Sequence, residues 1–165
     1  MNLTQERLKE LLHYDPETGI FVWLVSPNSR VQAGEVAGGP ASCGYWRIRV
    51  CGARHSAHRL AWFWMTGAWP LFEIDHRNGI GTDNRWKNLR DGTRSFNIQN
   101  QRRARSDNKT GFLGVHRSGK KERKGFVAKI QLDGKQRYLG VFSTAEAAHA
   151  AYLAAKRRIH PGCVI

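Results

Sequence analysis

The 165-residue sequence lacks several features that would place it in other classes of protein. It has no uninterrupted apolar run near the ~20 residues of a membrane span, and its first residues do not follow the pattern of a secretory signal. Its three cysteines include no C-x-x-C pair, which argues against a disulfide scaffold and against a zinc ribbon. We therefore expect an intracellular protein with no membrane partner, in a reducing environment.

Acidic residues are also scarce, so the chain is strongly basic. It holds 27 Lys and Arg against 13 Asp and Glu, a net charge of +14. Residues 102–165 hold 15 basic and 4 acidic residues, whereas residues 1–101 hold 12 and 9. A field of this sign attracts polyanions, with nucleic acid first among them. A solvated charged surface is the alternative, but the one-sided excess favours nucleic-acid contact by the part that follows the basic linker at Arg102–Thr110.

The first hundred residues show short helical and extended patterns. Ile20–Val25 is typical of a strand, because it is rich in β-branched and aromatic residues. Tyr45–Val50 alternates apolar and polar residues, which indicates a half-buried strand. The arginines Arg47 and Arg49 on its open face are either phosphate contacts or ordinary exposed side chains. His58–Met65 predicts a helix whose aromatic residues belong to the core. The role of His58 itself stays open, because it either supports a site or simply completes a hydrogen bond.

Chemistry is concentrated between residues 73 and 100. Asp75 and His76 adjoin at the end of a predicted strand, and Asn97 lies in the first turn of a helix that Ser95 is predicted to cap. Carboxylate and amide oxygens suit a hard divalent cation, and an imidazole is suited to deprotonate water near neutral pH. Each residue alone also has a structural explanation, but the set in one short window indicates phosphodiester cleavage.

These motifs resemble the HNH endonuclease family, in the branch common among phage and homing nucleases. The residues that support the resemblance are DH-x-N-G at Asp75–Gly79, DNR-x-x-NLR at Asp83–Arg90 and S-x-N-x-x-N at Ser95–Asn100. The resemblance extends over nearly all of residues 1–101. It implies a ββα-metal site. It also implies that the protein is located in the cytoplasm of a bacterial or phage-infected host cell.

The resemblance implies a role for each matching residue. His76 is the general base, Asp75 and Asn97 are the metal ligands, and Asn88 and Asn84 are structural residues of the motif. At the position of Asn97, the family has the histidine from which it takes its name. An oxygen ligand there favours Mg²⁺ or Mn²⁺ over zinc. No structural zinc is expected, because the paired cysteines of many relatives are absent.

The basic C-terminal part predicts three strands and one helix. Strands are expected at Phe112–His116, at residues 126–132 and at Lys135–Phe142, with a hairpin turn at Asp133-Gly134. The register across that turn predicts three facing pairs: Gln131 with Gln136, Lys129 with Tyr138, and Ala128 with Leu139. A helix capped by Ser143 is expected to run to about Ile159 and to pack its small residues on the apolar side of the sheet. The other side is left polar and basic.

This part resembles the plant ethylene-response-factor (Apetala-two) DNA-binding domain over about residues 107–162. The matching residues are Gly114-Val115, Tyr138–Phe142 and Thr144–Tyr152. The resemblance implies that the open sheet face enters a major groove, while the plant target sequence is not carried over because Lys129 and Gln131 replace its Glu and Arg. The expected DNA contacts are Arg117, Lys120, Lys121, Arg123, Lys124, Lys129, Gln131, Gln136 and Tyr138.

The sequence thus predicts an α+β chain with a ββα-metal nuclease module at 1–101 and, at 107–162, a three-stranded antiparallel sheet packed on one helix. The expected function is a divalent-metal-dependent endonuclease that hydrolyses phosphodiester bonds in double-stranded DNA, as a monomer without a small-molecule cofactor. A non-catalytic DNA-binding protein with a degenerate nuclease fold is the first alternative. An RNA-directed protein is disfavoured, because the A-form major groove is too narrow for the sheet.

Overall fold

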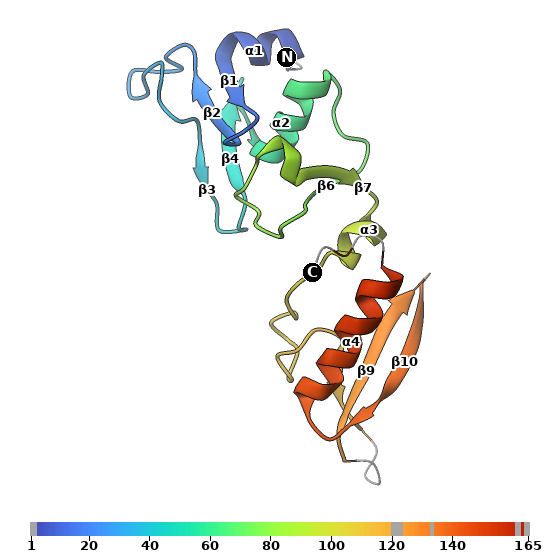
Figure 1. Cartoon of the computed structure of the whole chain (residues 1–165). Helices are drawn as coiled ribbons and strands as arrows, with labels where there is room; N and C mark the ends of the chain where they lie inside the picture. The colour runs from blue at the N-terminus through green and yellow to red at the C-terminus, as the bar shows by residue number, and fades with distance from the viewer. Residues whose placement is uncertain (1–2, 120–123, 133, 161–162, 164–165) are drawn as a thin grey trace. The chain divides into compact units, whose positions relative to one another are not determined.

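The computed structural model describes residues 3–119, 124–132, 134–160 and 163 of the chain (Figure 1). The fold is mixed α+β, with small antiparallel sheets as predicted. It divides into two compact units, Met1–Arg94 and Ser95–Ile165. The boundary between the units precedes the change in composition near residue 102. Within the described ranges, no helix is both long and apolar enough to cross a bilayer.

The first unit contains two helices, seven short strands and one 3₁₀ turn among its described residues. These elements are α1 (Gln5–Leu11), β1 (Leu12–Asp15), β2 (Ile20–Trp23), β3 (Gly39–Pro40), β4 (Trp46–Val50), β5 (Ala53–Ser56), α2 (Ala57–Thr66), β6 (Glu73–His76), η1 (Trp86–Asn88) and β7 (Leu89–Gly92). They pair as β1–β2, β3–β4–β5 and β6–β7. The strands expected at residues 20–25 and 45–50 and the helix expected at 58–65 are confirmed with small shifts of their ends.

The core of the first unit is formed by side chains from all three of its sheets. Ile48 and Val50 are buried on one face of β4, as the alternation predicted, and Leu60 is buried on α2. Ile74 of β6 and Leu89 of β7 pack into the same cluster. This packing fixes the β6–β7 hairpin on the rest of the unit, and with it the residues at the end of β6.

The second unit is a sheet with one helix across one face (Figure 1). Its elements are α3 (Arg94–Gln99), which starts at the last residue of the first unit, β8 (Val115–Arg117), β9 (Phe126–Leu132), β10 (Lys135–Phe142) and α4 (Ala145–Ile159). The strand order is β8–β9–β10, all antiparallel. The small residues Ala148 and Ala155 of α4 are buried against Val115, Ala128 and Ile130 of the sheet.

The register of β9 and β10 is predicted correctly near the turn and wrongly beyond it. Gln131 faces Gln136 and Lys129 faces Tyr138, as expected. A β-bulge between Tyr138 and Gly140 then places Gly140, and not Leu139, opposite Ala128. A bulge adds one residue to one strand, so each later residue moves to the other face. Asp133, half of the expected hairpin turn, lies outside the described residues.

Three other predicted boundaries are corrected. The cap of α4 is Thr144, whose hydroxyl accepts from the Ala147 N–H at 3.2 Å, and not Ser143. Helix α3 begins at Arg94, so Ser95 lies inside its first turn and does not cap it. The first strand of the sheet starts at Val115 and not at Phe112, because the side chains of Asn108 and Thr110 hold the preceding residues in a turn.

Gly114 is required where that turn enters β8. Its φ of +76° is unfavourable for a residue with a Cβ, and a Cβ placed there would lie inside the ring of Tyr152 on α4. Gly111 has a similar φ of +73° but has nothing within 4 Å of the same position. The two glycines therefore separate the cost of backbone strain from the cost of a steric clash.

We expect Gly114→Ala to destabilise the second unit by about 3–5 kcal/mol, from strain plus overpacking. Gly111→Ala is the matched control and is expected to cost only the strain, about 1–2 kcal/mol. Amide hydrogen exchange in α4 measures both. Equal costs for the two variants would contradict the tight Gly114–Tyr152 contact.

Candidate functional site

The β6–β7 hairpin presents Asp75 and His76 side by side at the end of β6. In its register Asp75 lies opposite Arg90 and His76 opposite Leu89. Side chains alternate along a strand, so the carboxylate and the imidazole point to opposite faces. His76 is buried, and the side chain of Asp75 is 15 % exposed.

Asp75 forms an ion pair with Arg90 across the hairpin. The Arg90 Nε and Nη2 donate to Asp75 Oδ2 at 2.9 and 2.7 Å, and the arginine side chain is only 9 % exposed. Hydrogen bonds of this charge-assisted kind are strong when they are shielded from water. Arg90 therefore fixes the orientation of the carboxylate.

Two other aromatic rings surround the ring of His76. His58 of α2 lies edge-on to it with ring centroids 5.1 Å apart, and Tyr45, which precedes β4, lies 5.9 Å away. Tyr45 and His58 are themselves 5.1 Å apart, so the three rings form one cluster. Gly81 allows this packing, because a Cβ there would meet the Tyr45 ring and the Gly44 carbonyl.

Asn84 sets the tautomer of His76. The Asn84 Nδ2 donates to the Thr82 carbonyl at 3.3 Å, so Oδ1 is the atom that faces His76 Nε2, also at 3.3 Å. Because an amide oxygen only accepts, Nε2 must be the nitrogen with the hydrogen. In the neutral ring the lone pair is then on Nδ1, which is the basic atom.

The loop that carries Asn84 is closed by Asn88. Its Oδ1 accepts from the Asn78 N–H at 2.9 Å, and its Nδ2 donates to Asn78 Oδ1 at 3.0 Å and to the Asp83 carbonyl at 2.7 Å. Asp83 in turn accepts from Asn78 and forms an ion pair with Arg85. The buried Asn88 thus connects both ends of the segment between β6 and β7.

The β1–β2 hairpin supports the other side of this loop. The Tyr14 hydroxyl donates to the Asn84 carbonyl at 2.6 Å, and the Trp86 N–H donates to the Pro16 carbonyl at 2.9 Å. Gly19 lies so close to the backbone of Asn84 and Arg85 that a Cβ would overlap it. The early Tyr-Asp-Pro-Glu-Thr-Gly segment therefore positions Asn84 from 70 residues away.

Burial keeps the imidazoles of this cluster neutral. It lowers the pKa of His76, which the hydrogen bond to Asn84 and the charges of Asp75 and Asp83 only partly oppose. Burial together with the neighbouring charges of His76 and Arg59 lowers the pKa of His58 to about 3. A neutral His76 has the lone pair that a general base needs.

The carboxylate oxygens of Asp75 suit a hard cation. Oδ2, however, already accepts hydrogen bonds from Arg90. The other predicted ligand, Asn97, lies on α3 in the second unit, and its pairing with Asp75 stays a prediction. The described residues include no group of three or more His, Cys, Asp or Glu that could hold a metal ion. A site built from one carboxylate and one amide is compatible with that finding, because an amide is not among those residue types.

The predicted DNA contacts that the structure describes share the second unit. Lys129 and Gln131 on β9 face Tyr138 and Gln136 on β10, on the side of the sheet opposite α4. Arg117 lies on β8 over the ring of Phe126, and Lys124 is exposed just before β9. The other three predicted contacts, Lys120, Lys121 and Arg123, lie outside the described residues.

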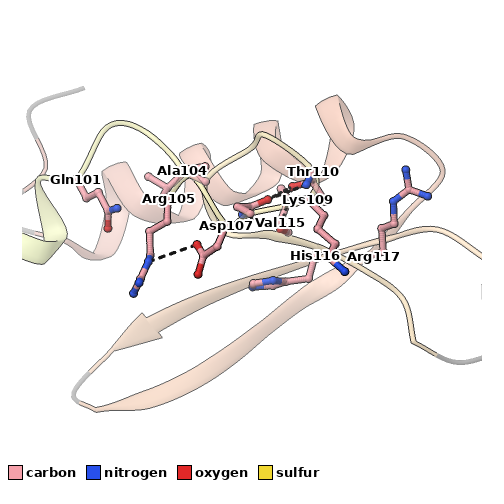
Figure 2. Close-up of a pocket in the computed structure, with 12 residues that line it drawn as sticks. Gln101, Ala104, Arg105, Asp107, Lys109, Thr110, Val115, His116 and Arg117 are labelled. Atoms are coloured by element: carbon pink, nitrogen blue, oxygen red, sulfur yellow. Dashed lines mark hydrogen bonds and ion pairs between the residues drawn. The ribbon is translucent and has the colours of Figure 1, made fainter.

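A groove of about 580 Å³ adjoins this sheet between residues 101–110 and β8. Its lining includes the cationic side chains Arg105, Lys109 and Arg117 (Figure 2). Asp107, the acidic residue in its lining, forms an exposed 3.4 Å ion pair with Arg105. The basic linker predicted from composition thus forms one wall of a cationic groove.

Sequence reasoning missed three contributors to the site. It gave Asn84 a structural role without its bond to His76, left the role of His58 open, and did not pair Asp75 with Arg90. The His76–Asn84 contact joins residues 8 positions apart, and the Asp75–Arg90 ion pair joins residues 15 positions apart, both within the β6–β7 hairpin. A predicted register for β6 and β7 is the signal that would have found the Asp75–Arg90 pair.

Comparison with known proteins gives one match. The model of the HNH endonuclease family matches residues 55–99, which run from β5 through α2 and the β6–β7 hairpin to α3. No curated protein and no solved structure matches the chain. The match supports a nuclease at the level of the family, and the family implies a divalent metal and a DNA substrate.

The depressed pKa of His58 makes stability depend on pH. The unfolded chain binds a proton at His58 near pH 6.5, whereas the folded protein resists protonation down to about pH 3. This stability is fully present above pH 6.5 and is lost as the pH falls toward 3, at up to about 1.4 kcal/mol per pH unit. We expect His58→Phe to flatten the dependence between pH 6.5 and 4.5.

Tryptophan fluorescence measures this effect in the right place, because all six tryptophans lie in the first unit. Val25→Thr, at a valine 43 % exposed in the first unit, is the control and is expected to leave the pH dependence unchanged, because it replaces no titratable group. His58→Asn serves if the phenylalanine is not accommodated. An unchanged acid dependence in both His58 variants would contradict a neutral, buried His58.

Proposed function

We propose that the chain is a divalent-metal-dependent DNA endonuclease in which His76 is the general base. The observation on which the proposal rests is the buried His76, hydrogen-bonded through Nε2 to Asn84 and adjacent in sequence to Asp75, within the segment that matches the HNH family. Family likeness alone would not select a nitrogen. The contact between Nε2 and the Asn84 oxygen supports Nδ1 as the proposed basic atom.

The proposed chemistry begins with a proton transfer. His76 Nδ1 takes a proton from a water molecule, and the water oxygen attacks the scissile phosphorus in line with the leaving group. The bond between phosphorus and the 3′ oxygen breaks, and the 3′ oxygen leaves as a hydroxyl after taking a proton from solvent. As the ring gains charge, the Nε2–H bond to Asn84 strengthens, because a charged donor makes a stronger hydrogen bond. Asn84 therefore positions the base before the transfer and stabilises it afterwards.

Asp75 and Asn97 are the proposed ligands of a Mg²⁺ or Mn²⁺ ion. Such an ion, when bound, stabilises negative charge on the phosphate and on the leaving oxygen. Arg90 holds Asp75 Oδ2, which restricts the carboxylate to one orientation. We assign Arg90 a positioning role on this ground, and Asn88 the role of closing the loop around the site.

In this proposal the second unit binds double-stranded DNA through the open face of the β8–β9–β10 sheet. Support comes from the Apetala-two resemblance, from the excess of basic residues after residue 101, and from the basic side chains around that face. A sheet of this width fits a B-form major groove. The predicted monomeric state is kept in this proposal.

A non-catalytic DNA-binding protein is the alternative, and one observation favours it. The Asp75–Arg90 ion pair already neutralises the carboxylate that the ion would need. In that case the chain would hold DNA without cutting it, with or without a divalent cation. Cleavage of plasmid DNA separates the two functions.

Supercoiled plasmid is expected to be nicked or cut in Mg²⁺ and left intact in EDTA. Replacing the base, His76→Ala, is expected to slow cleavage at least about a hundredfold. His13→Ala is the control, because His13 is exposed on β1 and lies far along the chain from the β6–β7 hairpin. Cleavage by His76→Ala at the parent rate, with its tryptophan fluorescence unchanged, would contradict the assignment.

DNA binding is expected to weaken steeply with salt. If the second unit neutralises ~6 phosphates, affinity falls on the order of a thousandfold between 50 and 200 mM salt. Arg117→Gln is expected to reduce the slope of log affinity against log salt by about 1. Arg30→Gln in the first unit is the control and is expected to keep the slope of the parent protein. Fluorescence anisotropy of a labelled duplex in EDTA measures the slope for each variant. A flat salt dependence would remove the electrostatic argument.

A further inference from the structure

The open face of the sheet in the second unit contains a hollow that the predicted DNA contacts do not explain. It has a volume of about 340 Å³ and is lined by residues of all three strands. The lining consists of His116, Arg117, Ser118, Gly119, Val127, Lys129, Tyr138 and Val141. Two of these, Val127 and Val141, are apolar side chains in a cationic surface.

The strand register places the two valines side by side. Val127 of β9 faces His116 on β8 and Val141 on β10, so the three side chains form one row across the sheet. The next row along β9 is Lys129 with Tyr138. Rows on one face are two residues apart, about 7 Å, which is the rise of about two base pairs.

The β-bulge is what exposes Val141. In an unbroken ladder Gly140 would lie opposite Val127, and Val141 would turn toward α4. The extra residue after Tyr138 reverses this, so Val141 is on the open face with 36 % of its surface exposed. Gly140, with a φ of +137°, supplies the backbone conformation. The chain thus turns an apolar side chain outward next to the row formed by Lys129 and Tyr138.

The chemistry of this hollow selects its occupant. Its cationic rim suits a polyanion, and the part of the chain after residue 101 is strongly basic. The apolar group that a DNA major groove presents is the C5-methyl of thymine. An exposed Val141 and a half-buried Val127, next to Lys129 on the same face, match a thymine methyl beside phosphates and polar base edges.

We propose that Val127 and Val141 contact thymine methyl groups in the major groove and so favour thymine at the contacted positions of the target. The proposal rests on the proposed function of the sheet as the DNA-binding face. From the row spacing, the thymine lies about two base pairs from the base pair that Lys129 contacts. The target is therefore selected in part by apolar contact and not by hydrogen bonds alone.

The test begins with selection of binding sites from random duplexes by the full chain in EDTA. Each thymine of the selected site is then replaced by deoxyuridine, which removes only the methyl group. The parent protein is expected to lose about fourfold in affinity at one or two positions, the worth of one buried methyl. No loss at any thymine overturns the proposal.

Variants then assign the effect to the valines. Val127→Thr and Val141→Thr keep the side-chain shape, and at least one is expected to abolish the deoxyuridine effect at its own position. Val25→Thr, at a valine 43 % exposed in the first unit, is the control and is expected to retain the effect. A deoxyuridine effect that persists in both sheet variants overturns the proposal. If the parent protein binds no duplex at all, the proposed DNA-binding function is refuted as well. That outcome is distinct from duplex binding without a deoxyuridine effect, which refutes only the thymine proposal.

Discussion

The closed loop between β6 and β7 is the constraint on which the rest of the site depends. Asn88 joins its two ends, while Tyr14 and Pro16 bind it from the β1–β2 hairpin. These bonds are largely shielded from water, so breaking one leaves a buried polar group unpaired, at about 1–3 kcal/mol. These contacts hold the loop so that Asn84 faces His76, and this contact determines the tautomer of the imidazole.

Local features of the fold were predictable from the sequence, and features that depend on tertiary contact were not. The span of α4 and the face it buries follow from the spacing of its alanines, and the register next to the hairpin turn follows from the turn itself. The cap at Thr144 lies one residue from the expected Ser143, because both residues have hydroxyls that suit the position. The bulge after Tyr138 has no such local signal, and Gly140 alone does not locate it.

The candidate site shows the same division. The residue types of Asp75, His76, Asn88 and Asn97 and their spacing indicated metal-assisted hydrolysis, because that chemistry needs oxygen donors and a base. The bond from His76 to Asn84 and the Arg90 ion pair depend on how a hairpin and a loop fold back on each other. Sequence therefore indicated candidate groups, while the structure shows that Asn84 contacts His76 Nε2 and that Arg90 contacts Asp75 Oδ2.

The most direct test of this account is the protonation of each ring nitrogen of His76, measured by long-range ¹H–¹⁵N correlation NMR near pH 7. The account predicts a neutral ring with hydrogen on Nε2 and a lone pair on Nδ1, and a change in this signal in Asn84→Ala. A ring protonated on Nδ1, or on both nitrogens, would contradict it, because the base would then be occupied before any water reached it.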